Sequence, residues 1–168
     1  MMKQTLGCLA VVLTLSAPAL AQTGTIPCGM AGQTKIFGCM DTINGVPSTS
    51  APVVSGPIVV QGWALSQWSS QQPSSVQVAY AGPWQPNGQR PLIFLSPENY
   101  TITWRQARPD VAAYFSTLMA ISSTQWGYAI VIPPGVIPDG ETILVLRFTD
   151  PAVGVGINIQ QVPITVAP

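Results

Sequence analysis

Alternation of apolar and polar residues is the main pattern of this chain from residue 58 onward. Val76-Gln77-Val78-Ala79-Tyr80 places three large apolar side chains on one face, which is typical of a half-buried β-strand. The same pattern, or a short apolar run bounded by turn residues, predicts further strands over 58–64, 92–95, 100–104, 126–132, 143–148, 157–159 and 162–166. The pattern therefore predicts about seven or eight short strands.

One segment has helical rather than strand periodicity. Apolar residues recur at a spacing of three and four between Val111 and Met119, which predicts a short helix. Pro109 suits the first helical position, and Asp110 suits either the N-cap or a carboxylate in the first turn. Short strands at this spacing, with one helix, predict an all-β fold: an immunoglobulin-like β-sandwich.

The first residues indicate export from the cell. Lys3 precedes an apolar run from Leu6 to Leu15, which is too short to span a bilayer as a helix. Ala19 and Ala21 then stand at the −3 and −1 positions of a cleavage site, so 1–21 is predicted to be a signal peptide. No later run is long enough for a membrane helix. We expect a secreted or periplasmic protein without an integral membrane segment, with a lead-in over 22–35 and one domain over 36–168.

Two of the three cysteines follow the predicted signal peptide. An even number of cysteines in an exported chain favours a disulfide, here between Cys28 and Cys39. A structural zinc site would need further thiols or histidines, and the chain has no histidine. The sequence therefore predicts one disulfide that pins the lead-in, and no metal site.

Low charge excludes several classes of function. Only 7% of residues are charged, against about 25% in an average soluble domain. No basic cluster is present to hold phosphates, so neither nucleic acid nor an anionic membrane surface is an expected partner.

The chain also offers little for catalysis. Without histidine the commonest general base is missing, and Lys35 is the only lysine after the predicted signal peptide. The six acids lie mostly at predicted turns: Asp41, Glu98, Asp110, Asp139, Glu141 and Asp150. Asp139 and Glu141 flank a glycine, but two carboxylates are few for calcium. We expect no enzyme activity and no cofactor.

The five tryptophans fall into two groups. Trp63, Trp104 and Trp126 lie in predicted strands and are expected in the core or on a sheet face. Trp68 and Trp84 lie among polar residues and prolines, where an exposed ring can stack on a sugar or anchor a protein partner. Either ring could instead fold back over the end of the sandwich. Trp68 and Trp84 are therefore the candidate binding residues.

A set of short motifs follows one another along the chain: Gly38-Cys39-Met40-Asp41-Thr42, Val54-Ser55-Gly56, Val60-Gln61-Gly62-Trp63-Ala64, Arg108-Pro109-Asp110-Val111, Gly127-Tyr128, Ile137-Pro138-Asp139-Gly140 and Thr149-Asp150. In this order the motifs resemble the bacterial Ig-like domains that occur as modules of secreted and cell-surface proteins. The chain departs from the family pattern at Ile43, where a proline is usual, and at Tyr128, where a phenylalanine is usual. The resemblance covers roughly residues 36–166 and implies a spacer or binding module.

The expected function is that of a secreted, non-catalytic structural or adhesion-type binding module at the bacterial cell envelope. Its partner would be a protein or a glycan at the cell surface. A carbohydrate-binding protein that uses Trp68 and Trp84 is the first alternative, and an enzyme or inhibitor with an unrecognised site is the second. Within the motifs, Gly62, Trp63, Arg108, Pro109 and Asp110 are expected to be structural, with Arg108 paired to a carboxylate such as Asp150.

Overall fold

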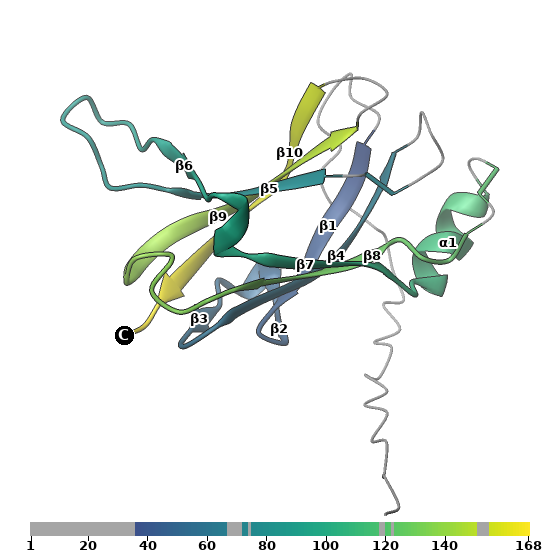
Figure 1. The fold of residues 1–168 in the computed structure, drawn as a ribbon, viewed down its shortest axis with the longest axis horizontal. Helices are drawn as coiled ribbons and strands as arrows, with labels where there is room; N and C mark the ends of the chain where they lie inside the picture. The colour runs from purple at the N-terminus through teal and green to yellow at the C-terminus, as the bar shows by residue number, and fades with distance from the viewer. Residues whose placement is uncertain (1–35, 67–71, 74, 118–119, 122, 151–154) are drawn as a thin grey trace, which may run out of the picture.

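The protein is a sandwich of two β-sheets, as a computed structural model shows (Figure 1). The structure describes residues 36–66, 72–73, 75–117, 120–121, 123–150 and 155–168. Over these residues, the first sheet has the order β2 (Val46–Pro47), β1 (Ile36–Ile43), β4 (Ile58–Ser66), β8 (Gly127–Ile132) and β7 (Thr101–Gln106). The second has the order β3 (Val53–Val54), β10 (Val155–Val166), β9 (Gly140–Asp150), β5 (Ser75–Ala81) and β6 (Leu92–Phe94). One α-helix, α1 (Pro109–Ser116), and two 3₁₀ turns, η1 (Ser48–Ser50) and η2 (Pro97–Asn99), complete these elements.

The order of the strands is that of an immunoglobulin domain. The run β1-β4-β8-β7 corresponds to the A-B-E-D sheet, and β10-β9-β5-β6 corresponds to a G-F-C sheet with an added C′ strand. Neighbouring strands pair antiparallel, except that β3 runs parallel to the end of β10. The predicted all-β, immunoglobulin-like sandwich with one short helix is confirmed. Of the ten described strands, β2 and β3 have only two residues each, which leaves eight longer ones.

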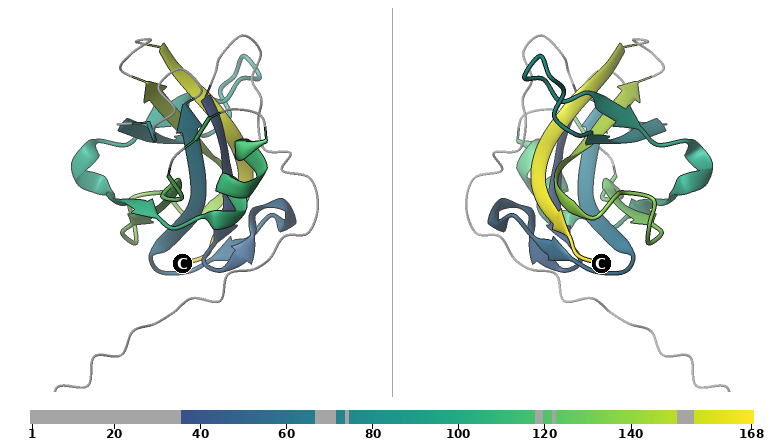
Figure 2. Two further views of the ribbon diagram at one scale, coloured as in Figure 1. Left: turned by 90° about the vertical axis from the view of Figure 1, so that its right-hand side faces the viewer. Right: turned by 90° about the vertical axis from the view of Figure 1, so that its left-hand side faces the viewer.

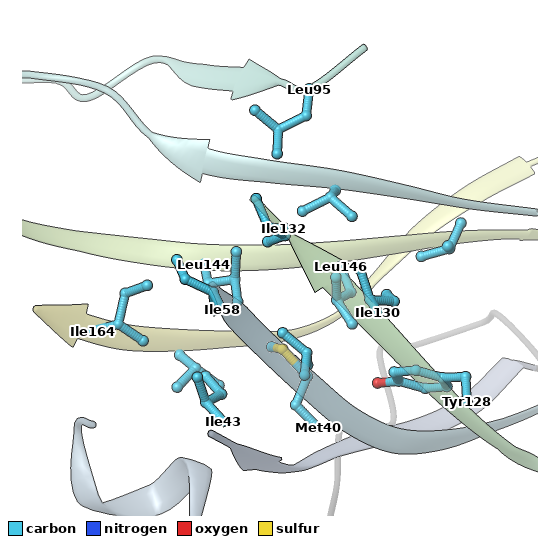
Figure 3. Close-up of a cluster of buried hydrophobic side chains, with 14 of the residues drawn as sticks. Met40, Ile43, Ile58, Leu95, Tyr128, Ile130, Ile132, Leu144, Leu146 and Ile164 are labelled. Atoms are coloured by element: carbon cyan, nitrogen blue, oxygen red, sulfur yellow. The ribbon is translucent and has the colours of Figure 1, made fainter. Parts of the chain in front are cut away.

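The main core lies between the two sheets. Period-two alternation turns one face of each strand inward, so apolar side chains from facing sheets interdigitate. Figure 3 shows part of this cluster, including Met40, Ile58, Tyr128, Ile130, Leu144, Leu146 and Ile164. The alternating segments of the sequence thus form the core that their pattern predicts.

A second, smaller core lies on the outer face of the first sheet, under α1. Val111 and Phe115 are one helical turn apart and are buried against Trp63 and Leu65 of β4. The rings of Trp63 and Phe115 meet edge to face, with centroids 5.5 Å apart. Figure 2 shows the helix on this side of the sandwich. The predicted burial of Trp63 is confirmed, but the indole packs between sheet and helix rather than between the sheets.

Strand β1 is the longest described strand that the hydrophobic pattern does not predict; the two-residue strands β2 and β3 are also unpredicted. Its inward residues Ile36, Met40 and Ile43 join the main core, while Phe37 and Cys39 face outward into the second core. Apolar residues on both faces remove the alternation that marks a strand. A β-bulge between Met40 and Thr42 also shifts the phase within the strand. The expected lead-in over 22–35 lies outside the described residues.

The N-terminal predictions also lie outside this part of the chain. Residues 1–21, the predicted signal peptide, are not among the described residues. In the residues that the structure does describe, α1 and the 3₁₀ turns are all too short to cross a bilayer.

Replacing Trp63 with alanine tests the second core. Because the indole is buried and fills the space beneath α1, Trp63→Ala should lower the free energy of unfolding by roughly 3–5 kcal/mol. Urea denaturation followed by circular dichroism measures the change. Trp84→Ala is the matched control, since Trp84 is 71% exposed and its loss should change stability by about 0.5 kcal/mol or less. Equal midpoints for the two variants would contradict a structural role for Trp63.

Candidate functional site

Four of the motifs that the sequence singles out, those containing Asp41, Gly62, Arg108 and Tyr128, meet at one place on the first sheet. Gly62 of β4 lies between Met40 of β1 and Tyr128 of β8 in the strand register. The hydroxyl of Tyr128 crosses above Gly62 and donates a hydrogen bond to the carbonyl oxygen of Cys39, at 2.8 Å. A Cβ atom on residue 62 would lie 1.9 Å from that oxygen and 2.6 Å from the hydroxyl. Glycine is therefore required at position 62, first by the backbone carbonyl of Cys39 and then by the tyrosine hydroxyl that bonds to it.

A second close approach to a glycine occurs at Gly127, the residue next to Tyr128. A Cβ atom on Gly127 would lie 3.0 Å from Cγ of Arg108 and 2.9 Å from Cβ of Gln106. The aliphatic stem of Arg108 thus passes close to Gly127, and its backbone N–H donates to the carbonyl of Thr124. The Gly127-Tyr128 pair consequently serves two contacts: the glycine admits Arg108, and the tyrosine bonds to β1.

Arg108 binds two carboxylates. Its guanidinium donates two hydrogen bonds to Asp110, from Nε at 2.9 Å and from Nη2 at 2.7 Å, and one from Nη1 to Asp41. Arg108 therefore ties β1 to the start of α1. The partners that the structure describes for Arg108 are Asp41 and Asp110. The side chain of Asp150, the partner suggested by the sequence, is not among those described, so that pairing stays a prediction. A bulge is the reason that sequence reasoning missed Asp41: it is the residue skipped in the pairing of β1 with β4.

Asp110 is a residue of the first helical turn and not the N-cap. The helix begins at Pro109, and the N-cap position is Arg108, whose side chain makes no capping bond. Of the two roles that the sequence left open, the first-turn carboxylate is the correct one. The Asp110 carboxylate faces Arg108, while Pro109 at the first position supplies no N–H that needs a partner.

Burial and ion pairing shift the pKa values of these three side chains in opposite directions. Burial raises the pKa of Asp41 above its usual value, even though Arg108 lowers it. Hydrogen bonds from Arg108 lower the pKa of Asp110, which is less buried. Burial opposes the charge of Arg108, but the bonds to Asp110 and Asp41 outweigh it and raise the pKa of the guanidinium. The cluster is a three-residue ion network in which the cation binds both anions.

A different region, the connection between β5 and β6, carries the most exposed of the large hydrophobic side chains in the described part of the chain. This connection extends away from the body of the sandwich (Figure 1). Trp84 lies in it and is 71% exposed. Backbone hydrogen bonds from Gly82 to Pro91 at 2.8 Å and from Gln85 to Gln89 at 2.9 Å close the hairpin on either side of the indole. An exposed tryptophan is thus presented on a hydrogen-bonded loop.

Arg90 anchors this hairpin to the sheet. Its guanidinium donates to the backbone carbonyls of Ala81, Gly82 and Glu141, at 2.7–3.1 Å. The same group lies 5.6 Å from the centroid of the Trp84 ring, in cation–π range. One arginine therefore fixes both the base of the hairpin and the indole, so little side-chain entropy remains for a ligand to remove.

Two further apolar side chains are exposed on β6. Leu92 is 40% exposed and Phe94 is 43% exposed, and their alternate positions put them on the same face of the strand. Arg147 of β9 lies 5.9 Å from the centroid of the Phe94 ring. Sequence reasoning identified this strand but not its exposure, because a short apolar run is equally typical of a buried strand.

The remaining predicted site residues have different outcomes. Trp68 and Cys28 lie outside the described residues, so the paired-tryptophan site and the Cys28–Cys39 disulfide stay predictions. Cys39 is buried in the second core. Trp126 is buried, as expected, and Trp104 is partly buried against the main core. Asp139 and Glu141 lie exposed at the turn into β9. Across the described ranges, no group of three or more Cys, Asp or Glu side chains is placed to hold a metal ion.

The sequence matches no protein-family model, and a search of curated proteins finds no match either.

A double-mutant cycle tests the ion network. Arg108→Ala should lower the free energy of unfolding by roughly 2–4 kcal/mol, because it leaves the mostly buried Asp41 without a cation. Asp110→Ala should cost only about 0.5–1 kcal/mol, since that carboxylate is more exposed to solvent. The double variant should lose less than the sum, because both residues act in one network. Strict additivity, measured by urea denaturation, would show that Arg108 and Asp110 are not coupled.

Proposed function

We propose that this protein is an exported, non-catalytic Ig-like module of the bacterial cell envelope that binds a partner through the β5–β6 hairpin. The observation that carries the proposal is the exposure of Trp84 on a loop anchored by Arg90. Tryptophan and arginine are the residues most enriched at the energetic centres of protein interfaces. The partner that fits best is a protein at the cell surface.

The motif residues support a module whose framework and binding residues are separate. Tyr128 bonds to β1 across Gly62, Arg108 bonds to Asp41 of β1 at the start of α1, and Trp63 is buried. None of these contacts involves the β5–β6 hairpin. A framework of this kind can hold its shape while an exposed loop contacts a ligand.

A carbohydrate-binding protein is the second candidate. The exposed ring of Trp84 supports it, because a bare indole face can stack on the apolar face of a sugar. Its neighbours Gln85, Asn87 and Gln89 are exposed and uncharged, and their amides could reach hydroxyl groups. A sugar-binding site formed by Trp84 together with Trp68 stays a prediction, because residue 68 is not described.

The enzyme alternative receives less support. Arg108 does bring two carboxylates together, which the sequence did not predict. A carboxylate pair that hydrolyses a glycoside must face an open space that holds the sugar. Here the guanidinium of Arg108 lies between Asp41 and Asp110 and bonds to both. We therefore retain a non-catalytic module as the proposal.

Mass spectrometry of the intact exported protein tests the envelope part of the proposal. The chain expressed with its own N-terminal segment should be recovered outside the cytoplasm and begin at Gln22. Its mass should be lower by two hydrogen atoms than that of the reduced form, as a Cys28–Cys39 disulfide requires. Cytoplasmic retention, or two free thiols in the exported and unfolded chain, would contradict this part.

Replacing Trp84 tests the binding part. Envelope fractions of the source bacterium serve as the probe, and bound protein is quantified against concentration. Trp84→Ala should weaken binding by roughly 30-fold, as the loss of a central interface tryptophan does, while leaving the unfolding midpoint unchanged. Tyr114→Ala is the matched control: Tyr114 is an exposed aromatic residue on α1 and its loss should not affect binding.

Enzymatic treatment of the fractions separates the two candidates. Binding that is lost after protease treatment identifies a protein partner, and binding lost only after glycosidase treatment identifies a glycan. Equal binding by wild type, Trp84→Ala and Tyr114→Ala would exclude the hairpin as the binding site.

A further inference from the structure

Strand β6 leaves one side of its backbone unpaired at the edge of the second sheet. It pairs only with β5 in the part of the chain that the structure describes, through Ala79–Phe94, Tyr80–Ile93 and Ala81–Leu92. The N–H of Leu95 donates to Val78, and the carbonyl of Pro91 accepts from Gly82. Because antiparallel bonding alternates along a strand, Ile93 also faces β5, and Leu92 and Phe94 face away. These two residues present two N–H and two C=O groups outward.

The side chains of these residues add an apolar surface to the open edge. Leu92 and Phe94 are the exposed large residues of β6, and the strand contains no charged residue. Natural edge strands commonly carry a charge that keeps other strands away. The nearest arginines are engaged: Arg90 with three backbone carbonyls and Arg147 with the ring of Phe94. The edge is therefore a template for pairing with another strand.

We propose that β6 pairs antiparallel with β6 of a second copy of this chain, joining two second sheets into one continuous sheet. This site is separate from Trp84, and the inference does not depend on the proposed binding function.

The register that the geometry allows is self-complementary. A two-fold axis at Ile93 sets Leu92 opposite Phe94 of the partner and Phe94 opposite Leu92 of the partner. Both are outward-facing positions, so four backbone hydrogen bonds can form between the copies. Each exposed leucine then packs against an exposed phenylalanine across the new pair. A foreign strand would need to supply such a match, whereas a second copy contains it.

Net charge does not oppose a second copy as the occupant. Residues 22–168 carry five basic and six acidic side chains, a formal net charge of −1, so two copies approach with little net repulsion. Pairing of three residues buries less than the ~1,000 Å² typical of a stable interface, so the expected dimer is weak.

Charge-swap variants provide the test. The purified full chain should dimerise with rising concentration in sedimentation equilibrium. Leu92→Lys/Phe94→Lys should be monomeric, because each lysine faces a lysine of the partner. Leu92→Glu/Phe94→Glu should be monomeric for the same reason. An equimolar mixture of the two variants at low salt should recover the dimer, since opposite charges then face each other.

Matched variants exclude misfolding and general charge effects. Thr101→Lys/Thr103→Lys adds the same charge to exposed positions on β7, the edge strand of the other sheet, and should leave dimerisation unchanged. Phe94→Pro removes an N–H that the fold does not use and should abolish the dimer while the protein stays folded by circular dichroism. A wild-type chain that stays monomeric to about 1 mM overturns the proposal, as does a charge-swap mixture that fails to associate.

Discussion

The hydrogen bond from Tyr128 to the carbonyl of Cys39 is the contact on which the first sheet depends. It spans β8, β4 and β1, and it is possible only because Gly62 leaves room beneath the phenol. The ring is fully buried, so an unpaired hydroxyl there would carry the full cost of desolvation. Trp104 of the first sheet packs edge-on against the same ring, and Phe148 of the second sheet packs tilted against it, which connects the bond to both sheets. One tyrosine thus sets the spacing of three strands and forms part of the main core.

The position of α1 also depends on residues of the first sheet. Gly127, next to Tyr128, admits the stem of Arg108, and Arg108 joins Asp41 of β1 to Asp110 of α1. That link holds α1 over the outer face, where Val111 and Phe115 cover Trp63. Four of the short sequence motifs thus contain the residues that join β1, β4, β8 and α1.

The exposed features lie elsewhere. Trp84, Leu92 and Phe94 belong to the β5–β6 hairpin and its edge strand, and Arg90 and Arg147 hold the two aromatic rings by cation–π contacts. A largely apolar surface of this kind, with an arginine against each aromatic ring, is suited to contact with another molecule. The near absence of charge from the chain has the same effect, because little electrostatic repulsion opposes association. Framework and contact surface thus occupy different parts of one sandwich.

The sequence by itself determined the sandwich, most of its described strands and the helix α1, because period-two alternation and a helical apolar face are local properties of the chain. It also predicted structural roles for Gly62, Trp63, Arg108 and Asp110. It could not place β1, whose two faces are both covered, nor the Asp41–Arg108 pair, which joins residues 67 positions apart through a bulge. Nor could it decide that Trp63 is buried under the helix while Trp84 is exposed. Burial on the outer face depends on which element packs there, and only the tertiary structure brings α1 over β4 and leaves the β5–β6 hairpin uncovered.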